Sequence, residues 1–273
     1  MKNKLFLRDA GILNLNHKEK YFTKNEFFSR LDNAIELCSK YDLNLQLSIS
    51  KKFYLDYKKN FYQRKRYLKK FDKITIHLHT YLDDPFGKDK ITKKFISEVK
   101  KFFKLLNNVV GVCVHSDEVA DFNTLKKFKT KNCYMAIENT DQKSKYGNKV
   151  EDVSKILNAN KFLSLVVDTS HVAQIKKKFK SQPNFHQYIS KFNKRCVEIQ
   201  VSSNKNLYGN FFKNKFKTDH TLLSAGKTKI IDEMKKEDLS NKNIVIEGVV
   251  PYNKIGIKLL EKEIKLLTKI TKL

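Results

Sequence analysis

Side chains that commonly bind divalent metal ions stand at or near the ends of apolar runs along the chain. They are His77, His79, His115, Glu138, Asp168, His171, Gln200 and Glu247. Carboxylates and imidazoles crowded together without a counter-ion would repel one another and lose hydration, whereas divalent cations would satisfy them jointly. Any one of these residues, taken alone, is more simply explained as a hydrogen-bonded structural residue or an ion-pair partner of a lysine. Their recurrence on consecutive runs is what favours a metal site.

The apolar runs alternate with amphipathic segments, as strands alternate with helices in an α/β protein. The predicted strands span 5–8, 43–49, 74–79, 109–115, 133–138, 162–168, 197–202 and 244–247, and the predicted helices span 24–40, 90–106, 119–128, 149–157, 185–192, 230–239 and 255–270. Eight alternations within roughly 250 residues are typical of a (β/α)8 TIM barrel, in which the carboxyl ends of the strands converge on one mouth. We therefore expect the metal-ligand residues to meet at that mouth.

An open, doubly wound sheet is the alternative fold. Its dinucleotide-binding versions carry a G-x-G-x-x-G motif after the first strand, and this chain has no such motif there. The chain also has no internal repeat and no linker rich in Pro, Gly or Ser. We therefore predict a single barrel domain over residues 1–273.

Charge and composition narrow the possible partners. The chain has 273 residues and a formal net charge of +27, from 56 Lys and Arg against 29 Asp and Glu. Part of this excess follows from a general richness in Lys and Asn, but the scarcity of acidic residues favours a polyanionic partner, DNA first.

Cysteine usage and the apolar runs indicate the compartment. The four cysteines lie far apart without a C-x-x-C pair, which excludes a disulfide scaffold and a cysteine-based zinc finger and indicates reduced thiols. No run has the length and apolarity of a membrane helix, and the N-terminus does not resemble a signal peptide. We expect an intracellular, cytoplasmic protein that is not secreted, with no membrane attachment and no obligate protein partner.

A basic and aromatic segment over residues 51–71 is the candidate nucleic-acid contact. Lysines and arginines alternate there with Phe and Tyr, and Asp56 is its one acidic residue before Asp72. Cations suit a phosphate backbone, and aromatic rings stack on or wedge between bases. The predicted contacts are Lys51, Lys52, Tyr54, Arg64, Lys65 and Arg66, together with Tyr81 in the loop T-Y-L-D-D-P. The alternative is an amphipathic helix with buried aromatics and a solvated basic face.

Five segments resemble those of xylose isomerase-like TIM barrels in type and order. They are I-E-N-T at 137–140, V-D-T-S-H at 167–171, I-Q-V-S-S-N-K followed by Y-G at 199–209, D-H-T-L-L-S-A-G at 219–226 and I-V-I-E-G at 244–248. Within that superfamily the chain is most similar to the endonuclease IV family of apurinic/apyrimidinic endonucleases. The loop at 80–85 also resembles that of viral members of this family.

The resemblance implies a centre of up to three Zn²⁺ ions. His79 and His115 would bind the first ion, and Glu138 would bridge it to a second. The second ion would also be held by Asp168, Gln200 and Glu247, and the third by His171 with Asp219 and His220. Two positions depart from the family pattern: Gln200 replaces a histidine, and adjacent Asp219 and His220 replace an Asp-x-His pair. His77 faces the same side of its strand as His79 and stays an alternative ligand.

The resemblance also implies a reaction. Glu138 and Glu247 would be catalytic in a metal-dependent hydrolase that cleaves the DNA backbone at abasic sites by a metal-activated hydroxide. One alternative is an isomerase, epimerase or dehydratase of a sugar or sugar phosphate, with one Mn²⁺ or Mg²⁺ on Glu138, Asp168, Gln200 and Glu247. Its substrate contacts would be His79, His115 and His171. Another is a homologue that binds nucleic acid and has lost the chemistry.

Overall fold

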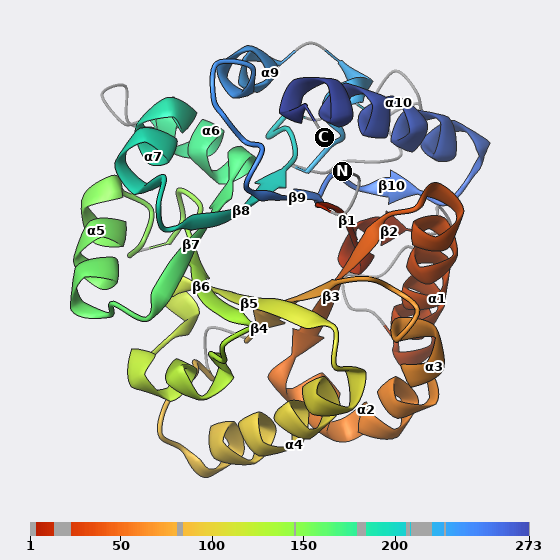
Figure 1. Ribbon diagram of the computed structural model, residues 1–273, viewed down its shortest axis with the longest axis vertical. Helices are drawn as coiled ribbons and strands as arrows, with labels where there is room; N and C mark the ends of the chain where they lie inside the picture. Colours follow the sequence, from red (N-terminus) through yellow and green to blue (C-terminus); the bar gives the residue numbers. More distant parts are fainter. Residues whose placement is uncertain are drawn as a thin grey trace.

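The fold is a closed barrel of eight parallel strands surrounded by helices (Figure 1). The computed structural model describes residues 4–13, 23–80, 84–144, 146–178, 184–205, 208, 220–226 and 228–272. The strands are β1 (Leu5–Arg8), β3 (Asn44–Ser50), β4 (Ile74–His79), β5 (Val109–His115), β6 (Tyr134–Glu138), β7 (Leu163–Asp168), β8 (Cys196–Val201) and β9 (Asn243–Ile246), joined in that order. Because β1 pairs with both β3 and β9, the sheet closes on itself. This closure confirms the (β/α)8 prediction and excludes the open sheet.

Helices and short strands connect the barrel strands. The helices are α1 (Lys24–Tyr41), α2 (Lys51–Gln63), α3 (Lys65–Leu68), α4 (Lys90–Leu106), α5 (Val150–Ala159), α6 (Thr169–Lys178), α7 (Phe185–Phe192), α9 (Lys229–Met234) and α10 (Lys254–Thr271). Outside the barrel, β2 (Ile12–Leu13) pairs with β10 (Val250–Pro251). In the part of the chain that the structure describes, no helix has the length and apolar character needed to cross a membrane.

The barrel strands begin and end within one residue of their predicted bounds. Two helical predictions differ more. The segment predicted as a helix over 119–128 is a 3-10 helix over Phe122–Phe128, which begins where the Asp121 carboxylate accepts the N–H of Asn123. The helix predicted over 230–239 ends at Met234. Helices α2, α3 and α6 are not among the predicted helices, although an amphipathic helix was the alternative interpretation of residues 51–71.

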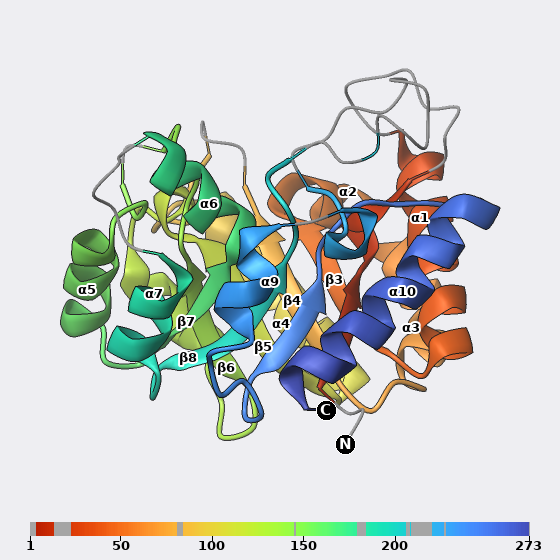
Figure 2. The ribbon, with the colours of Figure 1, turned by 90° about the horizontal axis from the view of Figure 1, so that it is seen from above.

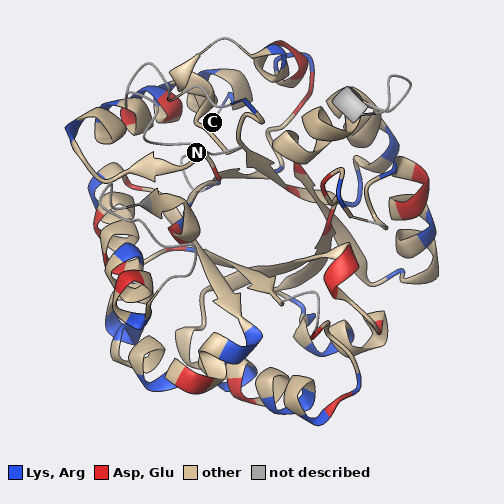
Figure 3. Cartoon of the chain, turned by 180° about the vertical axis from the view of Figure 1, so that it is seen from behind, with Lys and Arg blue, Asp and Glu red and all other residues tan. Residues whose placement is uncertain are grey.

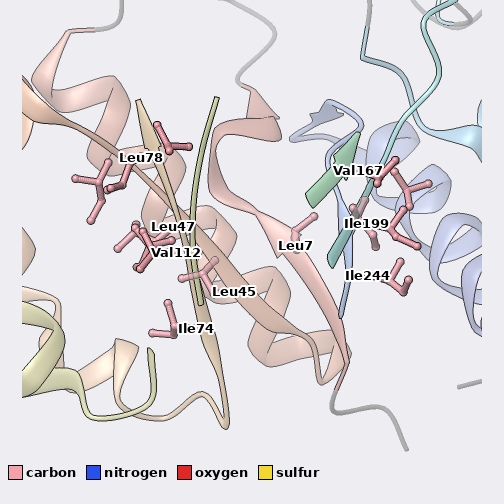
Figure 4. Close-up of a cluster of buried hydrophobic side chains, with 14 of the residues drawn as sticks. Leu7, Leu45, Leu47, Ile74, Leu78, Val112, Val167, Ile199 and Ile244 are labelled. Carbon is pink, nitrogen blue, oxygen red and sulfur yellow. The ribbon is translucent and has the colours of Figure 1, made fainter. Parts of the chain in front are cut away.

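Alternation along each strand separates an apolar layer from a polar barrel interior. Leu45 and Leu47 of β3 belong to the buried cluster between the strands and the helices (Figure 4). Gln46, between them, points into the barrel, where its Nε2 donates to Glu198 Oε1 of β8 at 2.8 Å. Because side chains alternate faces with a period of two, the same rule directs His77 and His79 inward.

A buried hydrogen-bond network fills the barrel beneath the mouth. Its centre is the Glu198 carboxylate, which accepts the Tyr134 hydroxyl at 2.7 Å and Gln200 Nε2 at 3.3 Å, besides the amide of Gln46. Asn243 Nδ2 donates to the Tyr134 hydroxyl oxygen at 3.2 Å. Burial raises the pKa of Glu198 although its hydrogen bonds act in the opposite direction. Such a network holds the strands' polar side chains in fixed orientations.

The structure corrects the assignment of Lys51 and Tyr54 as nucleic-acid contacts, because both side chains are buried. Lys51 Nζ donates to Asp84 Oδ1 at 2.6 Å and to Thr92 Oγ1 at 3.0 Å, and so links α2 to the start of α4. The Tyr54 ring packs on Phe61 with centroids 5.2 Å apart. These two residues therefore build the core, as the amphipathic-helix alternative predicted.

The other basic residues of this segment separate into two places. Lys52 is exposed at the start of α2, whereas Lys65 and Arg66 are exposed on α3 at the opposite end of the barrel (Figure 2). Asn108 fixes that location, since its Nδ2 donates to the carbonyl oxygen of Leu68 and its own carbonyl accepts the N–H of Ile74, the first residue of β4. Tyr81 lies outside the described residues.

Arg64 is largely occupied by contacts within the protein. Its guanidinium forms an ion pair with Asp32 at 2.6 Å and lies 4.5 Å from the centre of the Phe28 ring. Figure 3 shows Lys and Arg spread over the ring of outer helices. The segment over 51–71 therefore does not form one continuous basic surface at the barrel mouth.

We predict that Gly111→Ala destabilises the fold. A Cβ at Gly111 would lie 2.0 Å from Cζ of Tyr134, whose ring is fixed inside the barrel by its hydroxyl bond to Glu198. Overpacking of this kind lowers the free energy of unfolding by about 1–3 kcal/mol. Gly87→Ala is the control: its nearest heavy atom would lie at 3.6 Å, so a change within about 0.5 kcal/mol is expected. Urea denaturation measures both, and equal stability of the two variants would contradict this packing.

Candidate metal centre

The buried carboxylate of Glu138 lies at the centre of the barrel mouth. Glu138 ends β6 and is fully shielded from solvent. Its Oε2 lies 3.4 Å from His77 Nε2, and its Oε1 lies 3.2 Å from His115 Nε2 and 3.5 Å from His171 Nδ1. Neither oxygen has a hydrogen bond of normal geometry. The two oxygens therefore face different imidazoles.

Five imidazoles form a continuous arc across this mouth. Successive ring centroids are 4.0 Å apart for His79 and His77, 5.2 Å for His77 and His115, 5.5 Å for His115 and His171, and 5.9 Å for His171 and His220. They come from β4, β5, the start of α6 and the segment between β8 and α9. Residues that are far apart in sequence are thus brought together by the closure of the barrel.

Asp168 and His171 form a second donor group with His220. Asp168 Oδ2 lies 3.3 Å from His171 Nε2, and Asp168 Oδ1 accepts the N–H of Ser170 at 2.6 Å. His171 Nδ1 is 2.8 Å from the carbonyl oxygen of Asn139. Because a carbonyl oxygen only accepts, Nδ1 donates to it, and Nε2, which faces Asp168, is the nitrogen through which His171 could bind a metal ion. Burial opposes ionisation of Asp168, but the nearby imidazoles and the Ser170 hydrogen bonds hold its pKa below the usual value.

Three groups of donors in the described residues could each hold a metal ion. They are His77 with Cys113 and Glu138, His115 with Glu138 and His171, and Asp168 with His171 and His220, with donor atoms in each group no more than 4.8 Å apart. Imidazole, thiolate and carboxylate are ligands of zinc and of similar transition metals. Glu138 connects two of these groups through its separate oxygens, and His171 belongs to two groups but could bind one ion, through Nε2.

Arg8 contacts two predicted metal ligands, Glu247 and His79, that belong to none of the three donor groups. Its guanidinium forms an ion pair with Glu247 Oε1, and its Nη2 lies 2.9 Å from His79 Nε2. Burial and the Arg8 charge keep the pKa of His79 well below its usual value, so this imidazole is neutral and accepts from Arg8. The structure therefore places His77, rather than His79, within reach of Glu138.

The three acidic residues predicted for the mouth are joined by a chain of contacts. His171 lies against both Glu138 and Asp168, and His220 Nδ1 lies 3.9 Å from Glu247 Oε2. Hydroxyls also reach this nitrogen, with Ser202 Oγ at 3.0 Å.

Gln200 lies deeper, in the barrel interior. Its Nε2 donates to Glu198 Oε1 at 3.3 Å and to the Cys113 sulfur at 3.6 Å. Asp219, which was predicted as a ligand beside His220, lies outside the described residues.

Two residues of this centre were not predicted from the sequence. Cys113 was interpreted as a buried thiol, although it precedes His115 by two residues and so shares its inward face. Arg8 is not of a metal-ligand type, so the pattern of ligand residues at strand ends does not include it. The rule that singled out His115 also applies to Arg8, the last residue of β1.

Comparisons with known proteins show similarity in fold. No protein-family model and no curated protein matches the chain. Among solved structures, a probable 3-DHS dehydratase involved in petrobactin synthesis from Bacillus anthracis has a TM-score of 0.63 and 14% identity, over 97% of this chain and 98% of that one. A xylose isomerase domain protein from Planctomyces limnophilus has a TM-score of 0.58 and 11% identity, over 98% and 96%.

A third structure is a fusion of a xylose isomerase-like TIM barrel with a 4-hydroxyphenylpyruvate dioxygenase. It has a TM-score of 0.59 and 9% identity over 99% of this chain, which spans 43% of that one. The structural neighbours thus include xylose isomerase-like TIM barrels, as the sequence resemblance predicted. Membership of the endonuclease IV family within this fold stays a prediction.

We predict that Glu138→Gln removes more bound metal than any other single substitution at the mouth. Glu138 belongs to two donor groups and supplies a separate oxygen to each, so the neutral amide weakens both. Elemental analysis after dialysis against zinc measures the effect. Glu98→Gln, on the outer helix α4, should leave the metal content at the parent level. Equal metal content in Glu138→Gln and the parent would refute the central role of this carboxylate.

Metal affinity should rise with pH. Burial disfavours the charged form of His115, but the facing Glu138 carboxylate outweighs it and raises the pKa of His115 to about 9. At pH 7 the imidazole is therefore protonated, and a metal ion must displace that proton. We expect zinc binding through His115 to strengthen about tenfold per pH unit below about pH 9, because each bound ion releases the His115 proton. Competition with a chelator measures it, and a His115→Gln variant with the parent's pH slope would contradict this origin.

Proposed function

We propose that the chain is a metal-dependent phosphodiesterase that cleaves DNA at abasic sites. The observation that carries the proposal is the position of Glu138, whose two oxygens face different imidazoles within a connected set of donor groups. This arrangement suits a cluster of ions, which is the arrangement used in many phosphoryl-transfer sites. A cluster of divalent ions supplies Lewis acidity and an activated water to such a reaction.

The protein's own residues would orient the centre and move a proton. The carbonyl of Asn139 fixes the His171 ring, and the Ser170 amide fixes Asp168, so both face the same point. Glu247 is held through Oε1 by Arg8, while its Oε2 is buried without a hydrogen-bond partner. Glu247 Oε2 is thus available to accept a proton from an attacking water. Arg8 acts as the positioning residue that orients this oxygen.

The mononuclear isomerase or dehydratase alternative needs Glu138, Asp168, Gln200 and Glu247 on one ion. In the structure Gln200 is hydrogen-bonded to Glu198, and Glu247 is paired with Arg8. The four side chains would have to exchange these partners before they could share an ion. The geometry therefore favours the clustered, histidine-rich centre over the mononuclear set.

The choice of DNA as substrate is supported by the net charge of +27. It draws no support from Lys51 and Tyr54, which are buried, or from Lys65 and Arg66, which lie at the end of the barrel away from the mouth. The proposal therefore places the scissile phosphate at the mouth and assigns the α3 lysine and arginine no contact with the substrate.

The zinc-loaded parent protein should nick a duplex that contains one abasic site. Asp168→Asn should lower the nicking rate by about 100-fold or more, because it removes a charged metal ligand. Bound metal ions stabilise the charge of such a transition state by several kcal/mol. The double variant Lys65→Gln/Arg66→Gln should nick at the parent's rate and keep its salt dependence. A gel assay measures nicking by the parent and by the two variants, with an intact duplex as the control substrate. A parent that nicks neither duplex under saturating zinc would contradict the proposal.

A further inference from the structure

Cys113 differs from the three other cysteines in its hydrogen bonding. Cys38, Cys133 and Cys196 each lie within 3.4 to 3.7 Å of a backbone carbonyl oxygen, to which the thiol can donate. The Cys113 sulfur instead accepts a hydrogen bond from Gln200 Nε2 at 3.6 Å, inside the barrel. An amide hydrogen bond favours the thiolate, which is the form that binds metals. Burial and the nearby Glu198 and Glu138 carboxylates raise the pKa of the Cys113 thiol, so a bound metal ion must displace its proton.

Two further donors without hydrogen-bond partners lie beside this sulfur. His77 is fully buried, and neither of its ring nitrogens has a hydrogen-bond partner. Its Nε2 lies 3.4 Å from Glu138 Oε2, the carboxylate oxygen that does not face His115. One donor atom each from His77, Cys113 and Glu138 lies within 4.8 Å of the others. Buried polar groups left without partners destabilise a fold, so this arrangement calls for a bound partner.

The Gln200 amide is oriented by the network below it. The Glu198 carboxylate accepts from Gln200 Nε2 at 3.3 Å and would repel the amide oxygen in the same position. The amide nitrogen therefore faces both Glu198 and the Cys113 sulfur. In this orientation Gln200 stabilises negative charge on sulfur from outside the ligand set, as residues around metal-bound thiolates do.

We propose that Cys113, His77 and Glu138 bind a zinc ion at an inner site, beneath the other donor groups. Glu138 would bridge, with Oε2 toward the inner ion and Oε1 toward His115 and His171. One thiolate and one carboxylate balance the charge of the ion. Gln200, at the position where the resemblance led us to expect a histidine ligand, is assigned to support the thiolate.

The chemistry of the three donors indicates which metal ion the inner site would bind. Thiolate with imidazole favours zinc and disfavours Mg²⁺, Ca²⁺ and Mn²⁺, which prefer oxygen ligands. All three side chains are at most 2% exposed, so the inner ion would be shielded from solvent, and its three protein ligands would leave a fourth position for another donor. This site does not rest on the proposed phosphodiesterase activity, since it depends only on the chemistry and placement of these three donors.

X-ray absorption at the zinc edge tests the inner site in the full-length, zinc-loaded protein. The parent should show sulfur scattering at about 2.3 Å from zinc together with nitrogen and oxygen neighbours. Cys113→Ser should lose the sulfur contribution and about one zinc ion per chain. Cys196→Ser, which changes a buried cysteine that lies in none of the donor groups, should keep both.

Two results would overturn the proposal. One is a zinc-loaded parent whose zinc neighbours are nitrogen and oxygen alone, and this result needs no variant to fold. The other is sulfur scattering that persists in Cys113→Ser. Failure of the parent to nick abasic DNA while sulfur scattering is present would reject the phosphodiesterase and leave the inner site standing.

Discussion

A fully buried carboxylate, Glu138, is the constraint on which the barrel mouth depends. An isolated carboxylate in such a place would be strongly destabilising, so its charge must be compensated by neighbours. Among the described residues, the ion pairs of its two oxygens are with imidazoles from three different elements, and none is with a lysine or an arginine. At pH 7 a protonated His115 offsets the charge of Glu138, but both ring nitrogens of the buried His77 have no hydrogen-bond partner. Divalent cations shared between these groups would replace the His115 proton and also satisfy the His77 imidazole.

The arrangement of the barrel mouth also depends on the polar interior of the barrel. Barrels of this type usually fill their centre with branched apolar side chains, but here Glu198, Gln46 and Tyr134 form a hydrogen-bonded layer beneath the mouth. The layer orients Gln200 toward Cys113, and at the mouth Arg8 holds Glu247 and His79. These contacts occupy some of the candidate ligands and leave others free to bind metal. The set of available metal ligands therefore depends on the residues that contact them as well as on their own positions in the strands.

Local sequence pattern predicted much of this arrangement. Alternation of apolar and polar residues located the barrel strands, and the strand-end rule located His115, Glu138 and Asp168 at the mouth. The choice between His77 and His79 depended on Arg8, which lies about seventy positions away in the chain and contacts them only after the barrel closes. Lys51 and Tyr54 were misassigned for a similar reason, because their burial results from packing of α2 against α4 and not from any property of the segment itself.

The central claim is that several ions gather around Glu138, and anomalous diffraction from crystals soaked in zinc tests it most directly. The account predicts at least two zinc peaks on opposite sides of the Glu138 carboxylate, about 4 Å apart as in other two-metal centres. A single peak shared by Glu138, Asp168, Gln200 and Glu247 would contradict it, and so would a zinc-soaked crystal with no peak at the mouth.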